Sequence, residues 1–262
     1  MSDLMKGKRG LVMGVANDRS IAWGIARALH AEGAELALSY QGDAFGKRVK
    51  PLAEKLDVDL LVDVDVTDDD SLDACFGQIG EAWGKLDFVV HAIAFSDKNE
   101  LGGRFINTTR DNFKNSLTIS CYSLIDVARR AEPLMTDGGS ILTLTYMGSN
   151  RVTPFYNVMG VAKAALESSV RYLANDMGPN KVRVNAISPG PMKTLAGAAI
   201  SGARKTFTTA RDNAPLRDNA TLDSIGGTAV YLASDYGACT TGEIITVDGG
   251  YHVLGMMQPE NL

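Results

Sequence analysis

Short runs of apolar, often β-branched residues recur along the chain, and longer stretches with a helical spacing of apolar residues separate them. The runs are almost continuously apolar, which is typical of strands buried on both faces of a parallel sheet. Turn-forming residues bound them. They predict seven strands, at residues 9–14, 35–40, 59–66, 86–93, 139–145, 182–188 and 243–248.

The stretches between these runs carry the spacing and the end signals of helices. In 20–32, Ile21, Ile25 and Leu29 form one apolar stripe at i, i+4 and i+8, and Gly33 suits the position just after a helix end. Caps or terminators in the sequence predict further helices from Thr67 onward, over about 109–132, from about 155 to Gly178-Pro179, and from Thr221 to about Ser234.

Strand–helix alternation over seven strands predicts an α/β fold. Right-handed crossovers then give a single doubly wound, Rossmann-type domain over residues 1–262, with a seven-stranded parallel sheet flanked by helices. No linker or internal repeat interrupts the pattern. Segments 95–108 and 189–220 fit neither a strand nor a helix. Both follow strands, so they are expected at the carboxyl edge of the sheet, where such folds bind ligands.

Composition narrows the class of protein. The 262 residues are 45% hydrophobic and 22% charged, as in ordinary soluble proteins, and the net charge of −5 gives no reason to expect nucleic acid or a membrane as partner. Cys75, Cys121 and Cys239 are widely spaced and form no metal motif, so free thiols are expected. No apolar run is long enough to span a bilayer, and a cytoplasmic location is expected.

The first strand is followed by a turn with the properties of a phosphate-binding loop. Gly14 lets the backbone approach a pyrophosphate, which the N-terminus of the next helix faces, and Ser20 is placed to cap that helix or to donate to phosphate. The turn lacks the pattern Gly-x-Gly-x-x-Gly, so on its own it is equally well explained as a tight turn.

Polar residues at the ends of the second and third strands suggest which dinucleotide is bound. Gln41 is neither the acid usual for NAD nor the arginine usual for NADP, which favours NADH; it also suits a surface turn. Asp65 is placed to hold an adenine amino group, or is a strand-end carboxylate without a ligand. The acids 68–70 are explained better by a helix start than by a metal site, since no histidine joins them.

Tyr146, Tyr156 and Lys163 are the candidates for chemistry. On one helix, the seven-residue separation would bring Tyr156 and Lys163 to nearly the same face, ~10.5 Å apart along the axis. A nearby ammonium would make the phenolate of a tyrosine easier to reach. The alternative is a tyrosine and a lysine on an ordinary amphipathic helix.

From Gly14 to Asp248-Gly249-Gly250 the chain resembles the short-chain dehydrogenase/reductase superfamily, with two departures. Asp18 and Ser20 stand where further glycines are usual, and the lysine follows Tyr156 by seven residues instead of four. Both departures, together with Tyr146 ten residues before Tyr156, are similar to one branch. This branch is the bacterial enoyl-[acyl-carrier-protein] reductases of type II fatty acid synthesis.

The resemblance implies NADH-dependent reduction of the trans-2 double bond of an enoyl thioester, the last reductive step of chain elongation. It implies that Tyr156 stabilises the enolate oxygen, that Lys163 holds the nicotinamide ribose, and that Tyr146 orients the enoyl group. It also implies a homotetramer and an acyl carrier protein as partner. The dinucleotide would be bound by Gly14, Ser20, Ile21, Gln41, Asp65, Val66, Ile93, Lys163, Met192 and Thr194.

Residues 191–210, rich in Ala and Gly, are expected to form a substrate-binding lid that orders over the acyl chain; a short surface helix is the simpler alternative. Arg204 and Lys205 within it form a basic patch that would suit an acidic carrier protein.

Two other functions remain open at this point. A short-chain enzyme acting on ketones or alcohols would carry Tyr-x-x-x-Lys and a catalytic serine near position 143, where this chain has Thr143. A non-catalytic dinucleotide sensor would be expected to lose Tyr156 or Lys163, and both are present.

Overall fold

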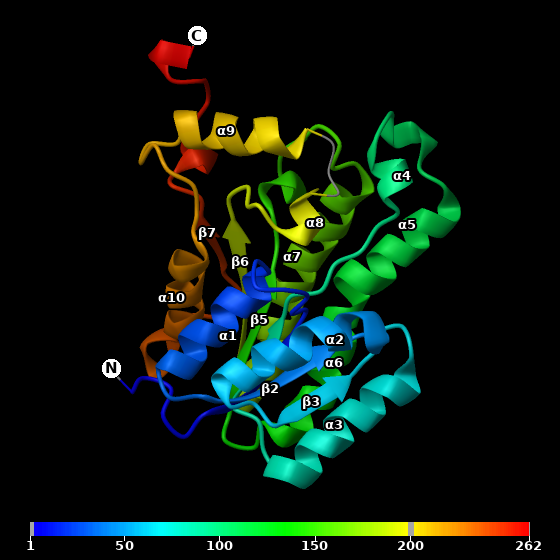
Figure 1. The fold of residues 1–262 in the computed structure, drawn as a ribbon, viewed down its shortest axis with the longest axis vertical. Coiled ribbons are helices and arrows are strands. Elements are labelled where there is room, and N and C mark those ends of the chain that lie inside the picture. The colour runs from blue at the N-terminus through cyan, green and yellow to red at the C-terminus, as the bar shows by residue number, and fades with distance from the viewer. Residues whose placement is uncertain (1–2, 199–201, 262) are drawn as a thin grey trace.

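The computed structural model describes residues 3–198 and 202–261. Its centre is a parallel sheet of seven strands, in the order β3-β2-β1-β4-β5-β6-β7 (Figure 1). The expected α/β class, strand number and parallel pairing are confirmed. The strands are β1 Arg9–Met13, β2 Glu35–Tyr40, β3 Leu60–Asp63, β4 Phe88–His91, β5 Gly139–Leu144, β6 Val182–Pro189 and β7 Ile244–Val247.

The strand order reverses next to β1. β1 pairs with β2 on one side, where Val12 lies opposite Leu38, and with β4 on the other, where Met13 lies opposite His91. Chain segments leaving β1 and β4 therefore diverge to opposite faces, which opens a crevice beyond their carboxyl ends. The predicted phosphate turn at Gly14 begins at this point.

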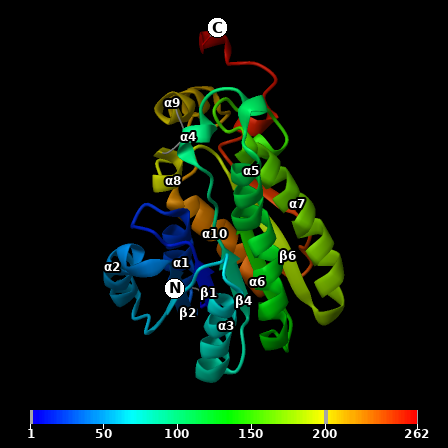
Figure 2. The ribbon, with the colours of Figure 1, turned by 90° about the vertical axis from the view of Figure 1, so that its right-hand side faces the viewer.

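Helices cover both faces of the sheet, and Figure 2 shows α1 and α2 on one side of the strands and α6 and α7 on the other. One buried cluster joins the sheet to α1, α2 and α10, and a second joins it to α3, α6 and α7. The helices are α1 Ile21–Ala31, α2 Gly42–Ala53, α3 Asp69–Trp83, α4 Lys98–Leu101, α5 Arg110–Leu117, α6 Ser123–Ala131, α7 Val158–Met177, α8 Leu195–Ala198, α9 Ala203–Asn213 and α10 Leu222–Ala233.

Several helix boundaries differ from the prediction. The expected helix 109–132 is α5 and α6 joined by a π-helical turn, Thr118–Tyr122, and Asp68 rather than Thr67 caps α3. α2 was not predicted. Its Gly and Pro51 weaken helix propensity, and burial of Val49 and Leu52 against the sheet decides its structure.

The two unassigned segments contain short helices at the carboxyl end of the strands. α4 lies in 95–108, whereas α8 and α9 lie in 189–220, and these helices gather at the top of Figure 1. Part of the expected lid, residues 199–201, lies outside the described residues. No helix in the described part of the chain is both long and apolar enough to cross a membrane.

Candidate active site

Gly14 is required by a close approach between two strand ends. Its φ is +94°, in the left-handed region, and a Cβ built on it would lie 2.1 Å from the carbonyl oxygen of Ala92, just beyond β4. Any side chain would therefore push the ends of β1 and β4 apart. Glycine at position 14 therefore allows the close approach of these two strand ends, beside which the dinucleotide is predicted to bind.

Ser20 does not cap α1, contrary to the first of its two expected roles. Its hydroxyl accepts hydrogen bonds of 3.0 Å from the backbone N–H groups of Ala16 and Asn17 and donates to the carbonyl of Asn17, so it shapes the turn. The N-terminus of α1 consequently has no side-chain cap and no acidic residue in its first turn. Uncapped N–H groups and the helix dipole fit an anionic pyrophosphate.

Gln41 and Asp65 meet at the far edge of this crevice. The carboxylate of Asp65 accepts hydrogen bonds from the backbone N–H and the hydroxyl of Thr67, at 2.8 and 2.7 Å. These bonds, chiefly the hydroxyl one, with a further bond from the side chain of Gln41, hold the pKa of Asp65 below its ordinary value. Asp65 is therefore an ionised acceptor, while Val66 beside it is buried in the core.

Tyr156 lies outside α7, which begins at Val158 rather than near residue 155. The expected helical spacing between Tyr156 and Lys163 is therefore wrong. The backbone on both sides of Tyr156 is left-handed, with φ of 62° at Phe155 and 39° at Asn157. Its ring lies against Gly148, where an added Cβ would come within 2.4 Å of the ring. A turn, and not a helix, aims this phenol.

The environment of Tyr156 keeps it protonated. The side chain is only 8% exposed, and its ring meets that of Tyr146 edge to face, with centroids 5.0 Å apart. Burial, followed by the neighbouring Tyr146 and Glu167, raises the pKa of Tyr156 well above its ordinary value. Burial likewise raises the pKa of Tyr146, to about 12. The expected lowering of the Tyr156 pKa by an ammonium is not found; the phenol is a neutral hydrogen-bond donor.

Lys163 is buried on α7 and its ammonium donates to the carbonyl oxygen of Leu144, at the end of β5, at 2.6 Å. Burial lowers the pKa of Lys163 to about 8, against the opposing effects of Cys121 and Glu167. Glu167, one turn further along α7, accepts a 2.7 Å hydrogen bond from the hydroxyl of Thr145. Consecutive residues at the end of β5 therefore hold both the amine and the carboxylate.

Thr143 does not belong to the site. It is buried, and its hydroxyl contacts Nδ1 of His91 at 3.0 Å and donates to the His91 carbonyl at 3.1 Å. Nε2 of His91 contacts the hydroxyl of Ser123 at 2.8 Å. Burial, with a smaller contribution from Lys163, lowers the pKa of His91 to about 3, so the ring is neutral. A serine-like catalytic role at position 143, which a ketone reductase would need, has no support here.

The remaining candidates lie around the crevice on different elements. Ile21 and Met192 pack, with Ala92, at the margin of the core cluster that includes α1, whereas Ile93 packs against the opposite cluster. The hydroxyl of Thr194 accepts a 3.0 Å hydrogen bond from the N–H of Gly197. Arg204 and Lys205 are exposed at the start of α9.

Sequence reasoning missed three contributors to this site. The Leu144 carbonyl is a backbone group and leaves no trace in the sequence. Glu167 stands four residues after Lys163, a spacing that places two side chains on one helix face and so offered a signal. Asn157 has a positive φ of 39° with ψ of −122°, outside the αL region that asparagine favours, so its residue type gave no signal of this conformation.

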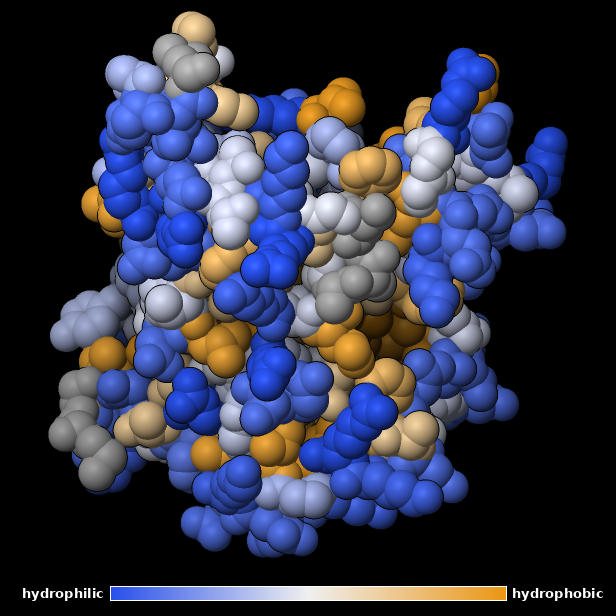
Figure 3. All heavy atoms as spheres, turned by 45° about the horizontal axis from the view of Figure 1, so that its top comes forward, coloured by the Kyte–Doolittle hydropathy of each residue, from blue (hydrophilic) through white to orange (hydrophobic). Residues whose placement is uncertain are grey.

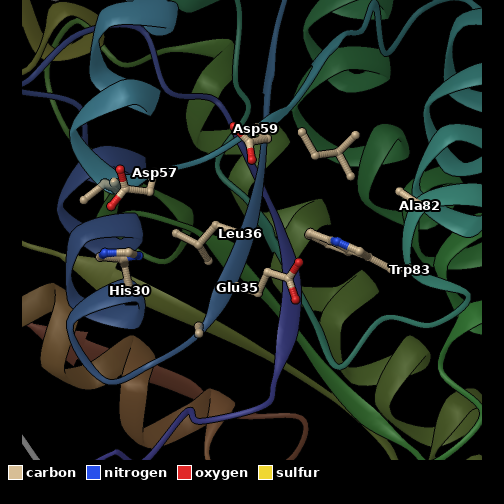
Figure 4. A pocket seen from close by; sticks show the side chains of 10 residues that line it. His30, Glu35, Leu36, Asp57, Asp59, Ala82 and Trp83 are labelled. Carbon is tan, nitrogen blue, oxygen red and sulfur yellow. The ribbon is translucent and has the colours of Figure 1, made fainter.

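A pocket of about 410 Å³ at the amino edge of the sheet contains none of the predicted site residues (Figure 4). His30 and Trp83 lie on opposite sides of this pocket. Leu36 lies between them, with Glu35, Asp57 and Asp59 around it. Parallel sheets bind ligands at the other edge. There the surface is hollowed, with hydrophobic residues in the hollow (Figure 3). Among the described residues, no group of three or more His, Cys, Asp or Glu could hold a metal ion.

Comparison with known proteins agrees with this geometry. Residues 14–252 match a family model described as Enoyl-(Acyl carrier protein) reductase. The enoyl-[acyl-carrier-protein] reductase [NADH] 2 of Rhizobium meliloti (strain 1021) is 59% identical, covering 100% of this chain and 98% of the relative. The reductase from Anaplasma phagocytophilum, solved in complex with NAD, is 58% identical with a TM-score of 0.95 over 97% of each chain. The Bacillus cereus reductase, solved with NADP+ and indole naphthyridinone, is 49% identical with a TM-score of 0.95, over 97% of this chain and 99% of that one.

Proposed function

This chain belongs to the enoyl-(acyl carrier protein) reductase family, and from that membership we propose how its residues carry out the reaction. The chain is an oxidoreductase that uses NADH to reduce the trans-2 double bond of enoyl thioesters, the last reductive step of fatty acid elongation. The observation that carries the proposal is a neutral, buried Tyr156 beside a strand-end site that holds the Lys163 ammonium.

The residues around the crevice fit NADH. The uncapped N-terminus of α1 faces the pyrophosphate, with Gly14 and Ser20 in the turn and Ile21 as the first residue of the helix. Gln41, the ionised Asp65 and Val66 hold the adenosine, and Ile93, Met192 and Thr194 border the nicotinamide side. These assignments rest on where the residues lie around the switch point of the sheet. Bound NADH supplies the hydride that adds to the β-carbon of the substrate.

Tyr156 donates a hydrogen bond to the thioester oxygen of the substrate. Negative charge develops on this oxygen as the β-carbon is reduced, so a donor aimed at it stabilises the transition state more than the ground state. The raised pKa of Tyr156 keeps the donor proton in place at neutral pH. A proton from solvent then adds to the α-carbon of the resulting enolate, which completes the saturated acyl chain.

Lys163 orients the ribose next to the nicotinamide. An ammonium has three donors, and one of them is used by the Leu144 carbonyl, so two remain for ribose hydroxyls. Tyr146 acts beside it by packing against the ring of Tyr156 and lining the enoyl pocket. The amine therefore serves the cofactor and the two phenols serve the substrate.

The described parts of the expected lid, residues 191–198 and 202–210, cover the acyl chain, and the basic pair Arg204 and Lys205 docks the acyl carrier protein. The ammonium of Lys193 lies 4.5 Å from the centre of the Phe207 ring, which ties α9 to the segment that follows β6. Arg204 and Lys205 are exposed, and within the described residues no ion pair neutralises either. Replacing both with Ala should lower kcat/KM for a carrier-linked enoyl chain and leave a small thioester of the same chain unaffected. If the double variant and the wild type had equal kcat/KM values for the carrier-linked chain, this docking role would be excluded.

The active form is a homotetramer that buries α5, α6 and α7. Large apolar side chains are exposed on these helices and on the π-helical turn, although soluble monomers rarely leave such patches uncovered. Light scattering on a size-exclusion column should give four times the chain mass, and Tyr172→Glu should reduce it. The exposed residues are Phe113, Tyr122, Ile125, Val161 and Tyr172.

The protein acts in the cytoplasm. Its three cysteines are free, with Cys75 and Cys121 buried, which suits a reducing compartment. Cell fractionation should recover the activity with the cytoplasmic enzymes.

Substrate comparison tests the reaction itself. With NADH, crotonyl thioester should be reduced to the saturated butyryl thioester, whereas acetoacetyl thioester should not be consumed. The reverse preference would assign the chain to ketone reduction. Lys163→Ala should weaken NADH binding, because the ribose loses its two donors.

A further inference from the structure

Asn157 has an uncommon backbone conformation directly after Tyr156. Its φ and ψ are 39° and −122°, and it stands at the position before the first residue of α7. An asparagine there usually caps the helix through its side chain, yet the side chain of Asn157 makes no such bond. A strained conformation of this kind persists only where surrounding contacts hold it.

Those contacts come from a distant part of the chain. The side-chain amide nitrogen of Asn157 donates to the carbonyl oxygens of Leu101, at 3.0 Å, and Gly103, at 3.4 Å. Both partners are acceptors, so only the NH2 group of the amide can face them. Leu101 ends α4, and Figures 1 and 2 both show α4 at the same end of the molecule as α8 and α9.

The segment that Asn157 holds is part of the wall around Tyr156. Leu101 is only 6% exposed and belongs to one buried cluster with Tyr156, Val158 and Met159, against which Tyr146 also packs. The two hydrogen bonds of the Asn157 side chain therefore join the residue that follows Tyr156 to the segment that covers the Tyr156 ring. Without these hydrogen bonds, both the turn at Asn157 and the segment around Leu101 would become more mobile.

We propose that Asn157 is a positioning residue for the reaction: its side-chain amide clamps the end of α4 to the catalytic turn and so fixes the direction of the Tyr156 hydroxyl. The inference deepens the proposed function and rests on Tyr156 being the donor to the substrate oxygen. A small displacement of such a group is costly, because a misplacement of about 1 Å can lower a rate about a hundredfold.

Three substitutions distinguish the contribution of the Asn157 side-chain amide from that of its backbone conformation. Asn157→Ala removes the amide, Asn157→Asp replaces the donor with a carboxylate that the two carbonyls repel, and Asn157→Gly removes the amide but adopts the backbone conformation freely. All three should lower kcat with an enoyl thioester about tenfold to a hundredfold. The Kd for NADH should stay within about twofold, because the Lys163 side of the site is unchanged. Wild-type kcat in Asn157→Gly would show that only the backbone matters and would overturn the proposal.

A matched control lies at the other end of the same helix. The amide of Asn180, after the end of α7, donates at 2.9 Å to the carboxylate of Glu132, and neither residue belongs to the site. Asn180→Ala should leave kcat unchanged. Thermal melting of every variant identifies any that fails to fold. Such a variant would lose NADH binding together with its activity.

A double-mutant cycle shows whether Asn157 acts through Tyr156. Tyr156→Phe alone should already have lost the donor, so adding Asn157→Ala to it should lower kcat less than about twofold further. A full additional loss in the Tyr156→Phe background would show that Asn157 acts elsewhere and overturn the proposal. Full activity of Tyr156→Phe alone would instead refute the proposed role of Tyr156, so the two failures are distinguishable.

Discussion

The ammonium of Lys163 and the backbone carbonyl of Leu144 form a buried hydrogen bond of 2.6 Å between α7 and the end of β5. A buried charge needs such a partner, because burial removes most of its hydration. The bond fixes a flexible side chain at the carboxyl edge of the sheet before any ligand binds. The same burial brings the pKa of Lys163 down to about 8, close to the working pH of most enzymes.

NADH affinity is therefore expected to depend on pH. Below pH 8 the free protein carries the ammonium; above it the amine is neutral and must gain a proton before it can bind the ribose as a cation. The Kd for NADH should be flat up to about pH 7.5 and rise by up to about tenfold per pH unit beyond pH 8. Fluorescence titration between pH 6 and 10 measures this. Lys163→Met should bind weakly at every pH, with no inflection.

Glu167 is expected to shift the pH at which that inflection falls. Its carboxylate, held by the Thr145 hydroxyl, favours the charged form of Lys163, as does Cys121; the neighbouring His91 is neutral in this range. Glu167→Gln keeps the shape and removes the charge, so the inflection in NADH affinity should move to lower pH. An unchanged inflection in Glu167→Gln would mean that Glu167 does not influence the pKa of Lys163. The same titration of Cys121→Ser tests the other group that favours the charged form of Lys163, which lies on the π-helical turn.

Gly14→Ala should disrupt the cofactor crevice. The added methyl group would meet the Ala92 carbonyl at 2.1 Å and would also force alanine into the left-handed region. Together these effects should lower the free energy of unfolding by at least about 2 kcal/mol and weaken NADH binding. Chemical denaturation and NADH titration check both effects.

Gly84→Ala is the matched control for Gly14→Ala. Gly84 also has a positive φ, of 68°, but an added Cβ there would have no atom within 4 Å. Gly84→Ala should lower the free energy of unfolding only by the smaller cost of placing alanine at a positive φ, and it should bind NADH normally. Equal losses in both variants would argue against a special role for the Gly14–Ala92 approach.

The seven strands were predictable because continuous apolar runs directly record burial on both faces. The turn at Gly14 was also predictable, since strand, glycine and helix follow one another in sequence. The start of α7 was not: α7 begins at Val158 because Asn157 is held by carbonyls from another element, which no local pattern records. The same holds for Lys163, whose pKa is lowered chiefly by burial, a property that the residues around it in the sequence do not record.

Tyr146 is expected to work mainly through its ring. Since the ring packs edge to face on Tyr156 with centroids 5.0 Å apart, Tyr146→Phe should keep that contact and retain kcat within a few-fold. Tyr146→Ala should lose the packing, worth about 0.5–1.5 kcal/mol, and let Tyr156 move. Steady-state kcat values of the two variants separate these roles. A loss in Tyr146→Phe as large as in Tyr146→Ala would assign the function to the hydroxyl.

The central claim is that the neutral phenol of Tyr156 stabilises the developing charge on the thioester oxygen. It is tested most directly by the kcat of Tyr156→Phe for oxidation of NADH with a trans-2-enoyl thioester. Phenylalanine keeps the ring against Gly148 and removes only the donor. We expect kcat to fall about a hundredfold or more while the Kd for NADH is unchanged. A kcat equal to that of the wild type would contradict the account.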